Sequence, residues 1–107
     1  MHKVILTAQA KRDLEEIKDY IARRLQNPTA AKNTLAAITK ELRRLASFPK
    51  LGPVLDRESP RLREERILVC GQYLAFYRAD EHAVIVHRVL YGRRNYAALL
   101  FELDEET

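Results

Sequence analysis

The sequence predicts an α+β fold in which an antiparallel helical hairpin covers one face of a β-sheet. The prediction rests on one short β-type run at the start, two stretches of helical periodicity after it, and three β-rich runs beyond a proline-containing break. The expected order is strand, helix, helix, strand, strand, strand. Because short gaps join the last three runs, they should form an antiparallel meander, and such a sheet buries one face under a cover. The helical hairpin is the available cover, and it should pack on one face.

The first half of the chain supplies the opening strand and the hairpin. Residues 3–7 form the β-type run. A first helix is expected over residues 8–25, on a stripe made of Leu14, Ile17, Ile21 and Leu25. Pro28 disfavours a helical residue before it and suits the first turn of a new helix. The second helix follows, on a stripe made of Leu35, Ile38, Leu42 and Leu45.

The second half reads as a sheet. Two prolines and a glycine in residues 48–53 end the helix, and a polar loop continues to Pro60. The predicted strands cover residues 66–70, 73–77 and 83–90, and residues 96–101 form either a short helix or an irregular cap. Alternation in the last strand predicts one face with Val84, Val86, Arg88 and Leu90, and an opposite face with Ile85, His87, Val89 and Tyr91.

Length and composition indicate one domain, residues 1–101, followed by an acidic tail, residues 102–107. The chain has 107 residues, 47% apolar and 32% charged, with no apolar run long enough to cross a membrane. We therefore expect a cytoplasmic protein with no membrane partner. The lone Cys70 lies in an apolar run and should be a small buried hydrophobe.

Positive charge is distributed unevenly. All six lysines lie in residues 1–50, whereas residues 51–107 contain eight arginines and no lysine. Arginine presents a planar fork that suits phosphate or carboxylate, so the second half is a candidate contact surface for nucleic acid or an acidic partner. Codon bias explains the missing lysines equally well.

The sequence contains no phosphate loop, nucleophile elbow or metal-binding spacing, so we expect no cofactor and no metal. The remaining constellation consists of two arginine-rich clusters, at the start and the end of the meander. We predict that both clusters converge on one edge of the sheet. The candidate target-binding residues are Arg61, Arg63, Arg66, Arg88, Tyr91, Arg93, Arg94 and Tyr96.

Each candidate also has a structural interpretation. His87 would be a half-buried histidine with one hydrogen bond, and Arg88 an ion pair or a snorkelling stem. Arg93 and Arg94 would be a solvated turn. For these two arginines we favour function, since Gly92 lets the backbone turn sharply and present both side chains.

The end of the meander resembles RelE/ParE-type toxins, whose last strand often reads R-V-L-H-G-x-R-D. Residues 88–95 match this pattern, with Tyr91 at the position of the histidine and Asn95 at that of the aspartate. The resemblance covers residues 4–96. Its upstream landmarks are Ala8, Asp13, Leu14, Ile17, Tyr20, Ile21, residues 45–49, Gly52, Leu62 and Arg63.

The resemblance implies a toxin of a type II toxin–antitoxin system, neutralised by a cognate antitoxin that wraps its surface. RelE-like members cleave messenger RNA on the ribosome, whereas ParE-like members inhibit DNA gyrase. RelE-like nucleases carry basic residues in the middle strands, where this chain has Leu74, and residues 73–78 are closer to ParE-like sequences. We favour a ParE-like gyrase inhibitor, with a ribosome-dependent endoribonuclease and an inactive or repurposed binding module as alternatives.

A nuclease would need a base, a proton donor and cations for the phosphate. The candidates for that reading are Arg94, Arg63, His87 and Tyr91, with Glu64 or Glu65 as the base.

Overall fold

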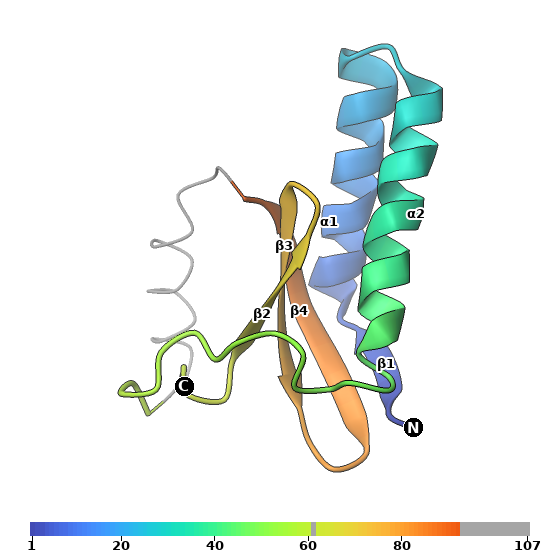
Figure 1. The fold of residues 1–107 in the computed structure, drawn as a ribbon. Helices are drawn as coiled ribbons and strands as arrows, with labels where there is room; N and C mark the ends of the chain where they lie inside the picture. Colours follow the sequence, from blue (N-terminus) through green and yellow to red (C-terminus); the bar gives the residue numbers. More distant parts are fainter. Residues whose placement is uncertain (61, 93–107) are drawn as a thin grey trace.

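The computed structural model describes residues 1–60 and 62–92, and the predicted order of elements is confirmed (Figure 1). The predicted terminal helix and the acidic tail lie outside the described residues, as do Arg61, Arg93, Arg94 and Tyr96. The elements are β1 (Lys3–Leu6), α1 (Ala8–Asp19), η1 (Tyr20–Arg24), α2 (Pro28–Arg44), β2 (Arg66–Cys70), β3 (Tyr73–Ala79) and β4 (Ala83–Tyr91).

The sheet has four strands in the order β1-β4-β3-β2. The predicted meander is confirmed, because β3 pairs antiparallel with both β2 and β4. The opening strand adds to it as a parallel neighbour of β4, with Lys3 opposite Ala83 and Leu6 opposite Val86. The sheet is therefore mixed, and β1 covers only the first half of one edge of β4.

Local sequence signals set the helix ends. Thr7 caps α1, since its hydroxyl accepts a hydrogen bond from the Ala10 amide, and Asn27 caps α2 in the same way through Ala30. The predicted first helix does not stay α-helical to Leu25. Its last turn, η1, is a π-helix that closes with a bond from the Leu25 amide to the Tyr20 carbonyl.

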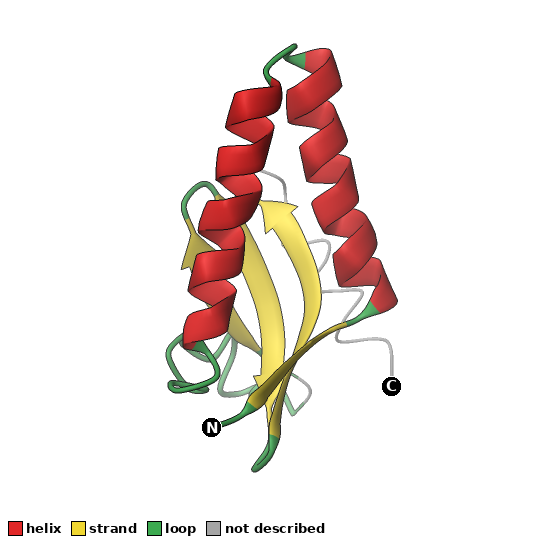
Figure 2. Ribbon diagram, turned by 90° about the vertical axis from the view of Figure 1, so that its right-hand side faces the viewer, coloured by secondary structure: helices red, strands yellow, loops and turns green. Residues whose placement is uncertain are grey.

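The two helices pack together on one face of the sheet (Figure 2). The core lies between the helices and the sheet, and both contribute side chains to it. Its buried members are Ala10, Ile38, Leu42, Leu45, Leu68, Cys70, Ala75, Tyr77, Val84, Val86 and Val89. Cys70 is a buried free thiol, as predicted. Burial raises its pKa to about 11, and the Glu41 carboxylate adds to the rise.

The predicted alternation in β4 is wrong beyond Val86. Tyr77 faces Val86 while Phe76 faces Arg88, so His87 is an extra residue in a β-bulge. The bulge shifts the phase of the strand by one. Val84, Val86 and Val89 consequently share the core face, whereas Arg88 pairs with Phe76, which lies outside the core cluster.

Candidate functional site

Among the described residues, no strand pairs with the second half of β4 on the side where β1 pairs with the first half. The chain leaves this edge at Thr7, whose amide donates to the Val86 carbonyl and whose hydroxyl donates to the His87 carbonyl. One turn and a half later along α1, the Asp13 carboxylate accepts a hydrogen bond from the Val89 amide at 3.0 Å. The side chains of Thr7 and Asp13 thus make hydrogen bonds to the β4 backbone that a neighbouring strand would otherwise make.

Asp13 also holds Arg88. The Arg88 guanidinium donates from Nε and Nη2 to the two Asp13 oxygens, at 2.9 and 3.1 Å. Asp13 is only 3% exposed, and a buried charge is costly unless it is compensated. The Arg88 guanidinium and the Val89 amide compensate the charge of the Asp13 carboxylate. The ion-pair interpretation of Arg88 is therefore confirmed.

A second polar cluster joins the three strands of the meander. Glu65, just before β2, is 5% exposed and accepts a hydrogen bond from Arg78 Nε. His87 Nε2 lies 3.4 Å from the Glu65 Oε1 atom, and Glu64 pairs with Arg78 at 3.7 Å. Glu65 Oε2 and His87 Nε2 are buried without a hydrogen-bond partner among the described residues. This cluster brings a carboxylate, an imidazole and a guanidinium together.

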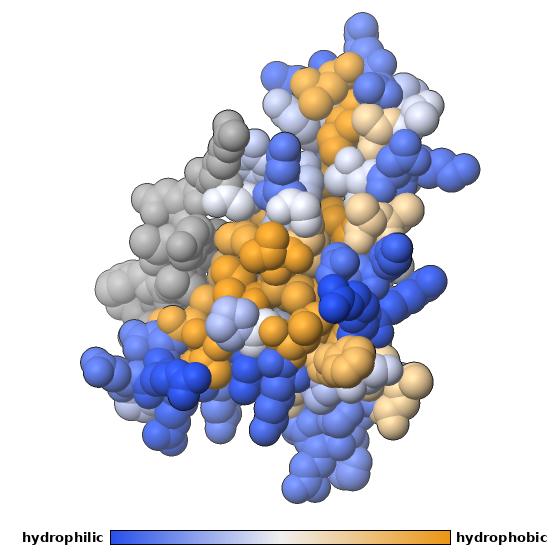
Figure 3. Space-filling model, in the orientation of Figure 1, coloured by the Kyte–Doolittle hydropathy of each residue, from blue (hydrophilic) through white to orange (hydrophobic). Residues whose placement is uncertain are grey.

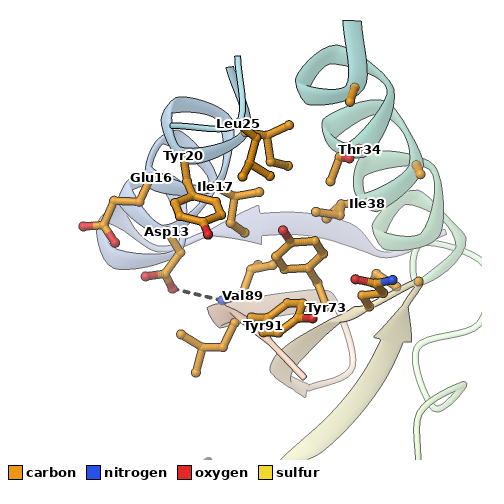
Figure 4. Close-up of a pocket in the computed structure, with 17 residues that line it drawn as sticks. Asp13, Glu16, Ile17, Tyr20, Leu25, Thr34, Ile38, Tyr73, Val89 and Tyr91 are labelled. Atoms are coloured by element: carbon orange, nitrogen blue, oxygen red, sulfur yellow. Dashed lines mark hydrogen bonds between the residues drawn. The ribbon is translucent and has the colours of Figure 1, made fainter. Parts of the chain in front are cut away.

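A large groove opens between the helical hairpin and the end of the sheet where β2 turns into β3 and β4 finishes (Figure 4). Its volume is about 920 Å³. The helical side is lined by Ile17 of α1, by Tyr20 and Ile21 of η1, by Leu25 directly after η1, and by Ile38 of α2. The sheet side is lined by Tyr73, Val89, Leu90 and Tyr91. We call this space the β4 groove.

Aromatic side chains form the floor of the β4 groove. The rings of Tyr73 and Tyr91 meet edge to face, with centroids 5.6 Å apart. Desolvation raises the pKa of Tyr73, with smaller contributions from Tyr91 and Tyr20. Tyr20 and Leu25 stand above them and are exposed. The groove therefore presents apolar and aromatic surface to solvent, which is typical of an interaction site.

Apolar surface also gathers around β2 on the face shown in Figure 3, where hydrophilic residues border it below. Val69 is the exposed member on this strand. The loop before β2 covers part of the strand's edge, because the Ile67 amide donates to the Pro53 carbonyl and the Leu55 amide to the Glu65 carbonyl.

The structure does not bring Arg66 and Tyr91 to the same end of the sheet. Strands β2 and β4 both run antiparallel to β3, so they are parallel to each other. Arg66, at the start of β2, pairs with Tyr77 of β3, which pairs in turn with Val86 of β4. Tyr91 lies at the other end, since its partner Tyr73 pairs with Cys70 of β2. Arg66 turns instead toward the preceding loop, donating to the Gly52 carbonyl at 2.8 Å. The predicted convergence is wrong for Arg66 and Tyr91.

The other candidates are placed as follows. Arg63 is exposed in the loop before β2, and His87 is half-buried beside Glu65. Sequence reasoning missed Asp13 as a structural partner of β4, and it missed the π-helical turn. Asp13 belongs to the landmarks of the family resemblance, and this was the signal that could have identified it. Nothing else distinguishes one carboxylate from the others in a charged helix.

Within the described ranges, no helix is long and apolar enough to cross a membrane, and no group of His, Cys, Asp or Glu side chains is arranged to hold a metal ion.

The fold is shared with proteins of two solved toxin–antitoxin systems. A chain of the chromosomal ParDE system from P. aeruginosa is 22% identical and superimposes with a TM-score of 0.70, over 85% of this chain and 96% of that one. A chain of the RelBE2 complex from Mycobacterium tuberculosis is 26% identical with a TM-score of 0.61, over 84% of this chain and 96% of that one. A search among curated proteins gave no significant match.

The architecture is thus that of the small toxin-type α+β proteins. The sequence model described as the ParE toxin of the type II toxin–antitoxin system, parDE, matches residues 4–96. This chain belongs to the ParE toxin family.

Proposed function

We propose that the chain is a ParE-like growth inhibitor that binds DNA gyrase in the cytoplasm and is neutralised by a cognate antitoxin. Family membership supports the toxin role. The target is inferred from residues 73–78, which are closer to ParE-like than to RelE-like sequences.

One observation favours binding over catalysis. Two of the polar groups that a nuclease would draw from the meander are engaged inside the fold, since His87 lies 3.4 Å from the Glu65 carboxylate. Glu65 itself is 5% exposed, which leaves its carboxylate little access to a ribose hydroxyl. These groups stabilise the sheet, and the exposed surface is left for partners.

The alternative is an endoribonuclease, and the meeting of Glu65, His87 and Arg78 is the observation in its favour. A carboxylate, an imidazole and a guanidinium are the base, acid and cation that cleavage through a 2′-hydroxyl requires. The two functions predict different products, so a single pair of assays separates them.

The purified chain should inhibit supercoiling of relaxed plasmid by gyrase and should leave transcripts intact in a translation reaction. The opposite pattern, normal supercoiling with codon-positioned cuts in ribosome-bound transcripts, would establish the endoribonuclease instead. Failure in both assays would support a repurposed binding module.

Arg94→Ala is the variant that tests the target contact. Arg94 lies outside the described residues and is chosen because it matches the arginine of the family pattern. The variant should lose toxicity and keep antitoxin binding. Arg57→Ala, which removes an exposed arginine in the loop before β2, is the matched control and should stay toxic.

A further inference from the structure

We propose that the solvent-facing side of α2 binds the phosphate backbone of duplex DNA. Three basic residues carry the contact, Lys32, Lys40 and Arg43, and we call them the α2 basic face. The inference goes beyond the proposed function, because it assigns a DNA contact to this chain itself, whichever target the toxin has. A gyrase inhibitor with such a face would contact the DNA that the enzyme holds as well as the enzyme.

The first argument is the position of the three cations on the helix. They occupy positions i, i+8 and i+11, which lie on one side of an α-helix, and all three are exposed. Ile38 and Leu42 are buried on the other side, which packs toward the core. Hydrophilic side chains project from the α2 side of the molecule, at the right of Figure 3. The α2 basic face is therefore accessible to a large partner.

The second argument is that these charges are not neutralised. Helix α2 has four basic residues and a single acidic residue, Glu41, which pairs with Arg44 at 2.9 Å. Among the described residues, no ion pair involves Lys32, Lys40 or Arg43.

Helix α1 differs in this respect, because its exposed charges cancel. Three are basic and three are acidic: Lys11, Arg12, Lys18, Glu15, Glu16 and Asp19. One of these pairs, Lys18 with Glu15, lies at 3.6 Å. Positive potential consequently gathers on the outer side of α2 and is not a general property of the helical hairpin.

The stability of the helix does not explain the pattern. The helix dipole favours cations in the last turn, which accounts for Arg43 and Arg44 but not for Lys32 or Lys40. Lys40 stands three and four positions before those two arginines, and like charges at these spacings destabilise a helix. The first turn of α2 has no acidic residue, although acids there would stabilise it. A bound polyanion accounts for the grouping of the cations.

The third argument concerns the class of polyanion. Ala36 lies between the cations, and no large hydrophobic residue of α2 is exposed. Protein interfaces have an apolar or aromatic core and are depleted in lysine, so this face is a poor match for an acidic protein. Single-stranded nucleic acid is bound by stacking of its bases on aromatic side chains, and α2 contains no aromatic residue. Duplex DNA requires only cations for its phosphates.

The spacing of the cations also suits duplex DNA. At about 1.5 Å per residue, Lys32 and Lys40 are separated by about 12 Å along the helix axis. The major groove of B-DNA is about 12 Å wide, so the two ammonium groups can reach phosphates on both of its sides. The major groove of double-stranded RNA is deep and narrow, which excludes this arrangement.

The test measures binding of the full chain alone to a short labelled duplex of mixed sequence, by fluorescence anisotropy over a range of NaCl concentrations. Each phosphate contact contributes about −0.9 to the slope of log K against log [NaCl], so three contacts predict a slope of about −3. The double variant Lys40→Gln/Arg43→Gln should reduce the slope to about −1 and weaken binding at low salt at least about tenfold.

The matched control is Lys11→Gln/Arg12→Gln on α1, which also removes one exposed lysine and one exposed arginine from a helix. Because both double variants lower the net charge by the same amount, their difference reports the position of the charges. The control should change the Kd less than about threefold, since its effect on DNA is that of a distant, screened charge. Circular dichroism checks that both double variants fold.

Equal losses in the two double variants would show that net charge alone attracts DNA, and would overturn the site. Tighter binding to a single strand of the same length would overturn the assignment to a duplex. The absence of binding by the wild type at low salt would overturn the inference as a whole. If Lys40→Gln/Arg43→Gln lost antitoxin binding and kept DNA binding, the face would belong to an acidic protein. Gyrase inhibition is measured separately, so the failure of this inference is distinguishable from a wrong target.

Discussion

Asp13 and Arg88 lie 75 positions apart in the sequence and form a two-bond ion pair at the free edge of β4. The same carboxylate accepts the Val89 amide, so one side chain compensates both a guanidinium and a strand-edge donor. The contact fixes α1 on the sheet at the point where β1 stops. It also positions Val89 at the start of the open backbone edge.

Asp13→Ala should lower the free energy of unfolding by roughly 3–5 kcal/mol, because it removes one member of a buried ion pair and the acceptor of the buried Val89 amide. Urea unfolding followed by circular dichroism measures the change. Asp13 is almost completely buried, so water has little access to replace the lost carboxylate.

A double-mutant cycle with Arg88→Ala is the control for that loss. The two substitutions should be strongly non-additive, since either one removes the same pair. Additive losses would show that Asp13 acts through Val89 alone. If Arg88→Ala left stability unchanged yet abolished toxicity, Arg88 would be a target contact after all.

A second long-range contact joins Gly52 to Tyr77. The Gly52 amide donates to the buried Tyr77 hydroxyl at 2.9 Å. Tyr77→Phe should cost about 1–3 kcal/mol in the free energy of unfolding, since a buried amide loses its acceptor. Tyr73→Phe removes one hydroxyl from the same strand and should change stability by less than about 0.5 kcal/mol. Similar losses in both variants would contradict a specific role for the Gly52 bond.

Gly52 is required at its position for a steric reason as well. A Cβ atom there would lie 2.2 Å from the Ile67 carbonyl oxygen. Gly52→Ala must therefore displace the loop from β2, and we expect a loss of stability of at least about 1 kcal/mol, measured by thermal unfolding. An unchanged melting temperature would show that the loop is free to move.

The turn between β3 and β4 should make stability depend on pH. The Asp80 carboxylate accepts hydrogen bonds from the His82 and Ala83 amides, which lower its pKa below 3.8. A lowered folded-state pKa contributes stability above the unfolded value, and that contribution disappears as the pH falls through the folded value. Asp80→Ala should therefore be less stable than the wild type at neutral pH; the difference should shrink only below about pH 3.8 and vanish once the pH lies below the lowered folded-state pKa. A difference that persists in acid would show that charge is not involved.

Much of the fold could be predicted from local patterns. Apolar residues at helical spacing define the two helices, and Gly71, which adopts a positive φ of 63°, marks the tight turn between β2 and β3. The strands are bounded by polar gaps in the same way. These features depend only on residues close in sequence, so periodicity is sufficient to find them.

The site could not be predicted in the same way, because it depends on contacts between distant residues. Nothing local to residues 3–6 indicates that they lie parallel to β4 and stop halfway along it. The bulge at His87 is equally hidden, since the strand is apolar on both sides of it. Without the bulge and the half-covered edge, neither the partner of Arg88 nor the open edge of β4 can be inferred.

Cys70 offers a direct probe of the packing beneath the groove. Its thiol is 3% exposed and has a pKa of about 11, so at neutral pH on the order of one molecule in ten thousand carries the reactive thiolate. A disulfide reagent should label the native chain very slowly and the urea-unfolded chain rapidly. The matched control is Val69→Cys in a Cys70→Ala background, since Val69 is 62% exposed on the same strand and a thiol there should label at once. Comparable rates for the two native proteins would mean that the end of β2 opens readily, and the core packing described around Leu68 and Cys70 would have to be revised.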